Sequence, residues 1–421
     1  MKKILTILCI GVVMTSYAQE FEISTELRPR FEYRHGFKTL IPDAEDAASF
    51  VSQRTRINLA YASEKLKAYI SLQNVRVWGD VSTLASSDVN DTAIHEAWAL
   101  LQLDPKFSLK LGRQEIVYDN HRMFGNVGWA QQARSHDAFI ASYRPNTKHQ
   151  LDLGLALNES SETLFKTDYT VNNYKAFQYL WYHTKASDLG ISFLVLNNGL
   201  AYTDVNDKQK VDYNQTIGTY LNYAKNKLQA DASVYFQTGK IANTSVSAYQ
   251  FSGNISYQIH EAFKAGLGAE YLSGTDSDST DDKIKSFNPW FGTNHKFNGF
   301  MDYFYVGNHS NSVGLLDIHA SLAYQKEKFS AKLIPHLFSS AARVVDFTGK
   351  EMPNSLGTEI DLVLGYNWTK DVSFQAGYSQ MFATDTMEAL KGGNSDATNN
   401  WAWLMVTVKP SLFKTNFAKE K

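Results

Sequence analysis

Residues Glu22–Arg34 read EISTELRPRFEYR, and this stretch alternates between polar and apolar side chains. The polar positions are Glu22, Ser24, Glu26, Arg28, Arg30, Glu32 and Arg34. The intervening positions are mostly apolar or aromatic: Ile23, Thr25, Leu27, Pro29, Phe31 and Tyr33. A helix, with its period of about 3.6 residues, would mix the two sets, whereas a β-strand places them on opposite faces. The stretch therefore predicts a strand with one polar and one apolar face.

The same alternation recurs along the chain. In the next such segment, Arg54 and Arg56 alternate with Thr55, Ile57 and Leu59. Each segment is close to the length of about 9–11 residues that a tilted strand needs to cross a bilayer. Eighteen segments show the pattern: 21–34, 53–62, 66–78, 94–103, 107–118, 136–144, 149–158, 176–185, 189–201, 215–224, 228–238, 247–259, 263–273, 313–325, 329–340, 356–368, 372–383 and 400–410.

The connections between these segments alternate in length. Short ones include Ser63–Lys65 and Asp104–Lys106. The long ones are 35–52, 79–93, 119–135, 159–175, 274–312, 341–355 and 384–399. Tight turns at one end and long loops at the other are typical of a membrane barrel. The sequence predicts an all-β protein: one transmembrane up-and-down antiparallel β-barrel of about 18 strands, with short periplasmic turns and long extracellular loops. The alternatives are a soluble barrel and a solenoid, but no internal repeat supports the latter.

The amino terminus has the features of a secretory signal peptide. Lys2 and Lys3 precede the apolar run Ile4–Met14, and Ser16-Tyr17-Ala18 offers small residues for cleavage. We expect a signal peptide at 1–18 and a barrel over 19–421, located in the bacterial outer membrane. The expected partners are outer-membrane lipids, lipopolysaccharide and the barrel assembly machinery. A formal net charge of −2 gives no indication of nucleic-acid binding.

Arginine is concentrated in the first third of the chain, where the alternation places several arginines on the polar face. A guanidinium group stays charged and presents a planar fork to carboxylates, so an arginine-lined pore would suit an anionic solute. The candidate pore-lining residues are Arg28, Arg30, Arg54, Arg56, Arg76, Arg113, Arg122 and Arg134. Arg–carboxylate ladders that brace the wall are the alternative, with acidic partners Glu26, Glu32, Glu96, Glu115 and Asp137.

In residues 107–118 the alternation of side chains does not place Arg113 and Glu115 on the inner face. If Leu109 and Leu111 point outward, Arg113 and Glu115 would also face lipid, which is costly. A β-bulge near Gly112 would restore the inward phase.

Two groups of residues carry a resemblance to a known family. The first is Gly112-Arg113-Gln114-Glu115, Arg122-Met123-Phe124-Gly125, Trp129, Gln131, Arg134 and Asp137. The second is Asn294-His295-Lys296-Phe297, Gly299 and Asp302-Tyr303-Phe304. The chain resembles the bacterial alginate-export family of outer-membrane porins. The resemblance implies an 18-stranded barrel whose electropositive constriction passes a uronic-acid polymer. By match, it assigns the lining to Arg28, Arg30, Arg54, Arg56, Arg113, Arg122 and Arg134.

Other motifs point away from catalysis. The chain has no HExxH, GxSxG or phosphate-binding glycine loop. Asp276, Asp278 and Asp282 are spaced like a calcium loop, but its glycine and final glutamate are absent. We therefore expect no metal, no cofactor and no enzyme. The expected function is passive passage of anionic saccharides such as alginate or oligouronates. The alternatives are a general diffusion porin and a barrel enzyme. The segment 119–135 is expected either to fold into the pore or to form a surface loop.

Overall fold

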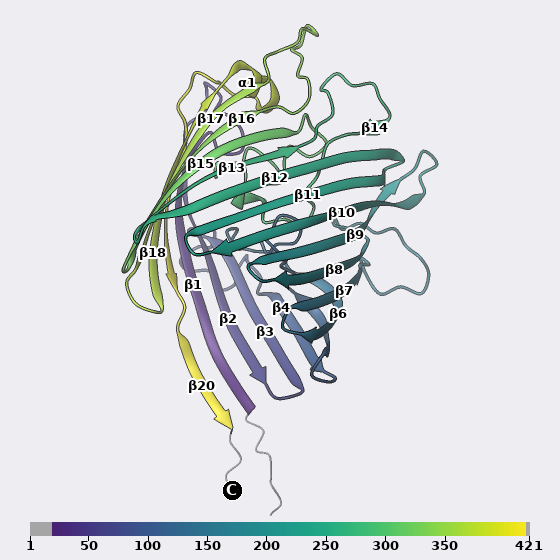
Figure 1. Ribbon diagram of the computed structural model, residues 1–421, viewed down its shortest axis with the longest axis vertical. Coiled ribbons are helices and arrows are strands. Elements are labelled where there is room, and N and C mark those ends of the chain that lie inside the picture. The colour runs from purple at the N-terminus through teal and green to yellow at the C-terminus, as the bar shows by residue number, and fades with distance from the viewer. Residues whose placement is uncertain (1–18, 418–421) are drawn as a thin grey trace, which may run out of the picture.

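The computed structural model describes residues 19–417, which form a closed antiparallel barrel of 18 long strands (Figure 1). The first ten strands are β1 (Gln19–His35), β2 (Ala48–Ala62), β3 (Leu66–Val77), β4 (Ala93–Gln102), β5 (Phe107–Gln114), β6 (His136–Asn146), β7 (His149–Leu157), β8 (Ala176–Ala186), β9 (Leu189–Thr203) and β10 (Gln209–Lys225). The others are β11 (Leu228–Ile241), β12 (Thr244–His260), β13 (Phe263–Leu272), β15 (Leu315–Lys326), β16 (Phe329–Ser339), β17 (Ser355–Asn367), β18 (Val372–Ala383) and β19 (Asn399–Val408). The expected signal peptide lies outside the described residues.

Four short elements complete the chain. They are β14 (Lys283–Ile284), β20 (Ser411–Phe417), the 3₁₀ helix η1 (Asn294–Lys296) and helix α1 (Asp385–Lys391). Among the described residues, no helix is both long and apolar enough to cross a membrane.

The barrel closes between β1 and the last strand. Each long strand pairs with the next along the chain, and Phe31 of β1 lies opposite Leu404 of β19. Beyond Pro410, β20 continues along β1, with Ile23 opposite Phe413. The final strand is therefore interrupted and then extended, rather than ending at residue 410 as the sequence indicated.

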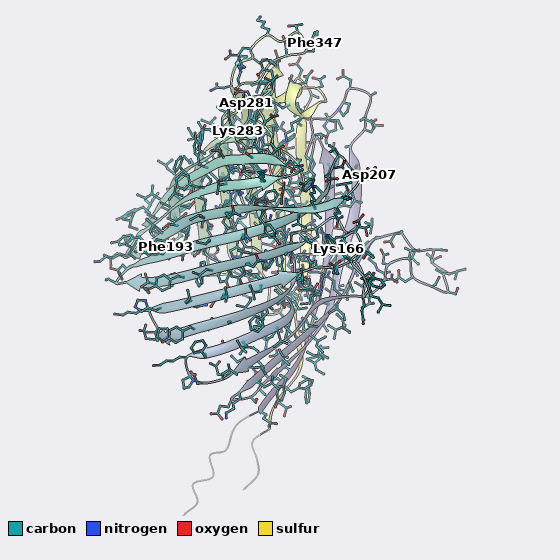
Figure 2. All side chains as sticks on the ribbon, turned by 90° about the vertical axis from the view of Figure 1, so that its right-hand side faces the viewer. Lys166, Phe193, Asp207, Asp281, Lys283 and Phe347 are labelled. Carbon is teal, nitrogen blue, oxygen red and sulfur yellow. The ribbon has the colours of Figure 1, made fainter. Side chains whose placement is uncertain are left out.

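The alternation of the sequence becomes the two faces of the wall. Leu27 on β1 is 41% exposed, whereas its neighbours Glu26 and Arg28 are buried. Phe193 on β9 likewise points away from the barrel (Figure 2). Because closure pairs every strand, an apolar outer face can lie in lipid without exposing backbone groups. The core of the molecule therefore lies inside the barrel.

Two outer connections are shorter than the predicted pattern of long loops. β9 and β10 are joined by residues 204–208, and β11 and β12 by Ala242 and Asn243 alone. Both residues of the second turn have positive φ, 47° and 69°. Two successive positive φ values are those of a type I′ hairpin turn, which matches the twist of the flanking strands. The strands here extend through residues that the sequence assigned to loops.

The two longest inward excursions, 115–135 and 285–312, fold inside the barrel. We call them together the interior plug. Phe124 and Phe291 form a β-bridge between the two segments and are buried. The segment 119–135 is thus an interior element and not a surface loop.

The predicted bulge at Gly112 is absent. The pairing of β5 with β4 and β6 keeps one register through Gly112, which adopts φ 113°. The irregularity lies instead between β3 and β4, where the register shifts at Ser71/Leu72. Glu115 turns inward because β5 ends at Gln114 and the chain there enters the interior plug.

Candidate functional site

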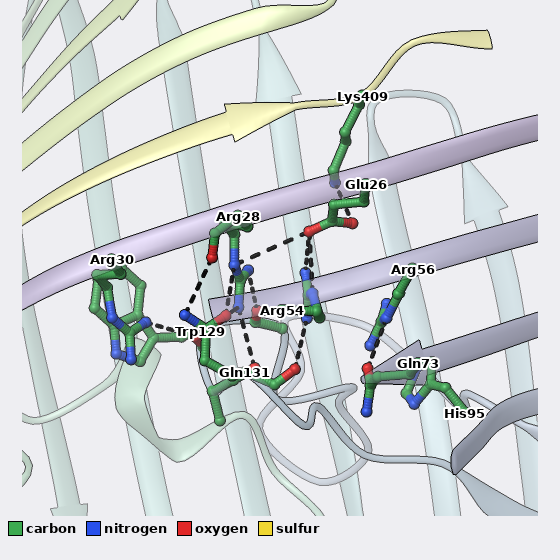
Figure 3. A network of polar contacts seen from close by, with 12 residues as sticks. Glu26, Arg28, Arg30, Arg54, Arg56, Gln73, His95, Trp129, Gln131 and Lys409 are labelled. Atoms are coloured by element: carbon green, nitrogen blue, oxygen red, sulfur yellow. Dashed lines mark hydrogen bonds and ion pairs between the residues drawn. The ribbon is translucent and has the colours of Figure 1, made fainter. Parts of the chain in front are cut away.

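Arg28 fastens the first plug segment to the barrel wall. Its Nη1 donates to the Gly128 carbonyl at 2.7 Å. Its Nη2 donates to the carbonyls of Trp129 and Ala130 at 3.0 and 3.2 Å (Figure 3). Its Nε donates to Oε1 of Gln131 at 3.1 Å. The three guanidinium nitrogens are therefore all engaged within the protein.

Arg30 is also engaged within the protein. Its Nε donates to Glu32 at 2.9 Å, and its Nη1 donates to the Trp129 carbonyl at 2.7 Å. Its guanidinium lies 4.0 Å from the centroid of the Trp129 ring. Glu32 accepts further hydrogen bonds from Arg34 and from Nε1 of Trp401. These contacts brace the wall against the plug.

Arg54 has a carboxylate partner in Glu26. Its Nε and Nη2 both donate to Glu26 Oε1, at 3.0 and 2.6 Å. Nζ of Lys409 lies 3.1 Å from Oε2 of the same carboxylate (Figure 3). Glu26 thus joins β1 and β2 to the closing strand.

Arg122 joins the two plug segments to each other and to β13. It donates from Nε and Nη2 to the two oxygens of Glu270, each at 2.8 Å. Nη2 also donates to Asn298 at 2.8 Å and Nη1 to Asn294 at 3.2 Å. Arg122 and Asn294 belong to the two separate sequence signatures, which therefore meet inside the barrel.

An inner cavity of about 610 Å³ lies between the plug and the end of the barrel that carries the short turns. Arg56 lines it and donates from Nε to Gln73 Oε1 at 2.7 Å. Its Nη2 is buried without a hydrogen-bond partner, and Arg56 forms no ion pair within the described residues. The charged residues that line the cavity are Arg28, Arg54, Arg56, Lys409, Glu22, Glu26, Glu96, Glu115 and Asp371.

An outer cavity of about 430 Å³ lies on the other side of the plug, towards the long loops. Arg134 lines it and donates from Nη1 to the Gly292 carbonyl at 3.0 Å. Residues 19–417 give Arg134 no carboxylate partner. The residues that line this cavity are Gln73, Ala93, Ile94, His95, Arg113, Gln132, Ala133, Arg134, Ser135, His136, Asn173, Tyr174, Trp290 and Phe291, and none of them carries a carboxylate.

His95 and Gln73 form the partition between the two cavities. His95 lines both of them. Gln73 accepts from Arg56 on the inner side, and its Nε2 donates to the carbonyl of Gln132 at 3.0 Å. Nε2 of His95 lies 2.9 Å from Glu115 Oε1. The partition therefore consists of side chains held by hydrogen bonds between the wall and the plug.

One predicted lining arginine, Arg76, lies elsewhere, which corrects the sequence prediction. Arg76 shares the outward phase of β3 with Leu72 and pairs with Asp88 in an outer loop. Arg113 shares the outward phase of β5 with Leu111 and pairs at 2.8 Å with Asp137, whose side chain is 61% exposed. Arg113 therefore lines the outer cavity at its rim, although its strand phase is outward, and Asp137 lies exposed beside it.

The sequence interpretation missed the partition and the plug contacts. Gln73 could have been found from phase, because it occupies the inward alternate position of residues 66–78. His95 could not, because the register shift between β3 and β4 sets its orientation. The sequence singles out Gln131 only through the family resemblance. It gives no signal for Lys409, which lies at the end of the predicted closing strand 400–410.

The sequence profile of the alginate export family matches residues 19–401. The chain belongs to the alginate export family. The matched range contains both plug segments and every arginine discussed above. A search of curated proteins gives no match.

Solved structures similar to this alginate export family member share its barrel at low sequence identity. OccK9 (OpdG) of Pseudomonas aeruginosa is 11% identical, with a TM-score of 0.62 over 93% of this chain and 98% of that one. OccAB4 of Acinetobacter baumannii is 10% identical, with a TM-score of 0.62 over 94% and 98%. OpdK of P. aeruginosa, solved with vanillate, is 10% identical, with a TM-score of 0.59 over 93% and 99%. The family and the shared porin fold identify the protein as an outer-membrane channel.

Proposed function

We propose that this channel passes anionic saccharides such as alginate or oligouronates passively across the outer membrane. The observation that supports the proposal is the placement of Arg134 and Arg56 on opposite sides of the partition. Each is a permanent cation for which the described residues offer no carboxylate partner. A solute carboxylate could therefore move from one guanidinium group to the next.

The outer cavity has the chemistry that a uronic acid needs. A guanidinium group binds a carboxylate through two parallel hydrogen bonds. Asn173 and Gln132 supply amide groups for hydroxyls, and Tyr174 and Trp290 supply aromatic surface. Nε1 of Trp290 is buried without a hydrogen-bond partner. Because no carboxylate lines this cavity, an anion entering it meets little repulsion from the lining.

A general diffusion porin without preference is the second candidate. Arg28, Arg30 and Arg122 are engaged by the protein itself, as a bracing role requires. The inner cavity also contains five carboxylates beside its cations. This mixture favours a polar, unselective vestibule on that side of the plug.

The proposal extends to the surroundings of the barrel. Residues 1–18 would direct secretion and be removed. Outer-membrane lipids and lipopolysaccharide would contact the apolar outer face, and the barrel assembly machinery would insert the chain. No soluble cofactor is part of the proposal.

Planar-bilayer recordings of purified wild type, Arg56→Gln and Arg134→Gln test the proposal. Under a salt gradient, the wild-type reversal potential should show anion preference, and oligouronates should block the current. Loss of a charge-assisted hydrogen bond should weaken block by about tenfold in each variant. Arg76→Gln is the matched control, because Arg76 lies in the outward phase, and it should behave as wild type. Two results would leave the unselective porin as the function. One is a wild-type channel without anion preference, and the other is unchanged block by oligouronates in both variants.

A further inference from the structure

A third interior cavity, of about 510 Å³, contains a histidine–carboxylate cluster that the proposed solute path does not use. Asp317 and His319 lie two residues apart on β15, and His336 lies on β16 directly opposite His319. Alternate residues of a strand share a face, so the three side chains lie on the same side of the wall. One ligand atom from each residue lies within 4.8 Å of the other two.

Asn254 orients the His319 ring. Nδ2 of Asn254 donates to Asp231 at 2.9 Å, so its Oδ1 faces Nε2 of His319 at 3.1 Å. An amide oxygen only accepts, so Nε2 donates to it, and in the neutral ring Nδ1 is left with a free lone pair. That Nδ1 is buried without a hydrogen-bond partner and lies 3.6 Å from Oδ1 of Asp317. A lone pair directed at a carboxylate is repulsive unless a cation lies between them.

His336 is held in a way that suits a metal ligand. Its Nδ1 lies 2.9 Å from Asp317 Oδ1, and its Nε2 lies 3.6 Å from Asp361 Oδ2. Asp361 is itself fixed by the backbone N–H of Phe300, which donates to it at 3.2 Å. A carboxylate behind the distal ring nitrogen is the usual partner of a metal-bound histidine.

We propose that Asp317, His319 and His336 form a binding site for a divalent transition-metal ion of the Zn²⁺ class. Zinc–ligand bonds of about 2.0–2.1 Å separate tetrahedral ligand atoms by about 3.3 Å. Oδ1 of Asp317 lies 2.9 Å from Nδ1 of His336 and 3.6 Å from Nδ1 of His319, and these distances lie on either side of that value. Two imidazole nitrogens and one carboxylate oxygen form a typical zinc ligand set with a fourth position open to water. All three residues line the cavity, from which water can reach them.

Gly268 makes room for the supporting hydrogen bond. It lies opposite His319 in the pairing of β13 with β15. A Cβ at this position would lie 2.4 Å from Nε2 of His319 and 2.1 Å from Oδ1 of Asn254. A side chain at position 268 would therefore clash with the hydrogen-bonded pair of His319 and Asn254. Lys296 and Lys332 line the same cavity and oppose a cation, but Asp317 and Asp361 flank the histidines directly.

Zinc binding to the full detergent-purified chain tests the assignment. The protein is stripped with a chelator, and zinc per chain and its affinity are measured by competition with a fluorescent chelator. Cobalt substitution reports tetrahedral geometry by its visible absorption. Wild type should bind one zinc ion per chain. His319→Gln should lose the site, and Asn254→Ala should bind about tenfold more weakly, because it removes the support of a ligand.

His183→Gln is the matched control, because His183 is a histidine on β8 whose Nδ1 is hydrogen-bonded to the Ser192 hydroxyl and which belongs to no metal-ligand cluster among the described residues. It should bind zinc as wild type does. Heat-modified mobility on gels verifies that each variant is folded. Wild type that binds no zinc, or a folded His319→Gln that binds it equally, overturns the assignment.

Discussion

Arg28 and Gln131 bind each other in both directions. Nε and Nη2 of Arg28 donate to Oε1 of Gln131 at 3.1 and 2.9 Å, and Nε2 of Gln131 donates to the Arg28 carbonyl at 3.3 Å. The two residues are 103 positions apart, one on β1 and the other in the interior plug. This reciprocal contact ties the plug directly to β1.

Gln131→Leu should loosen the plug. The change leaves Arg28 Nε buried without an acceptor, which costs about 1–3 kcal/mol. Single-channel recordings should then show a higher or noisier conductance than wild type. Gln375→Leu is the control, because Gln375 is an exposed residue of β18 and is not part of the lining of the three cavities described above. Equal conductance in Gln131→Leu and wild type would mean that this contact does not limit the open path.

Glu270→Gln should lower the free energy of unfolding far more than the loss of an exposed ion pair would. Arg122 and Glu270 are both buried, and breaking a buried pair leaves an uncompensated charge that costs about 3–5 kcal/mol. Asp137→Asn is the control, because the Arg113–Asp137 pair is exposed and should contribute about 0–1 kcal/mol. The free energy of unfolding in denaturant measures both. Similar losses in the two variants would contradict the bracing role of Arg122.

The strands were predictable from sequence because side chains that face lipid are apolar, and this produces an alternating pattern along every strand. The strand alternation also places Arg76 on the outer face, because it lies four residues after the outward Leu72. The ties of the plug were not predictable, because Arg28 binds backbone carbonyls about a hundred residues away. Backbone carbonyls carry no sequence signal.

The cluster of Asp317, His319 and His336 was also not predictable from the sequence, although its residues lie close together along the chain. His319 and His336 are 17 positions apart and match no metal motif. Only the register of the β15–β16 hairpin places them opposite each other. A search for Asp-x-His on an inward face, followed by a histidine at the mirrored position of the next strand, would have found it.

Helix α1 should dock more firmly at alkaline pH. Burial lowers the pKa of the Lys391 ammonium from 10.5 to about 7, and its Nζ lies 5.3 Å from the Phe304 ring of the plug. Between these two values the undocked state binds more protons, so the free energy of undocking rises with pH. Below pH 7 both states are protonated and the full penalty for burying the charge remains.

Hydrogen–deuterium exchange of residues 385–391, corrected for intrinsic rates, measures this effect. Protection should increase from pH 6 to pH 9 in wild type. Lys391→Met removes the titrating group and should show little change across the same range. An increase of equal size in both proteins would assign the effect to another group.

If solutes cross the plug at the partition and anions are preferred there, a thiol placed in the partition should react faster with anionic reagents. The sole cysteine, Cys9, lies in the expected signal peptide, so His95→Cys places the only thiol of the secreted chain between the two cavities. Leu111→Cys on the outward face is the control. The account predicts that an anionic thiol reagent reduces the current of His95→Cys from either side of the bilayer, faster than a cationic reagent of the same size. An unchanged current, or faster reaction with the cationic reagent, would contradict it.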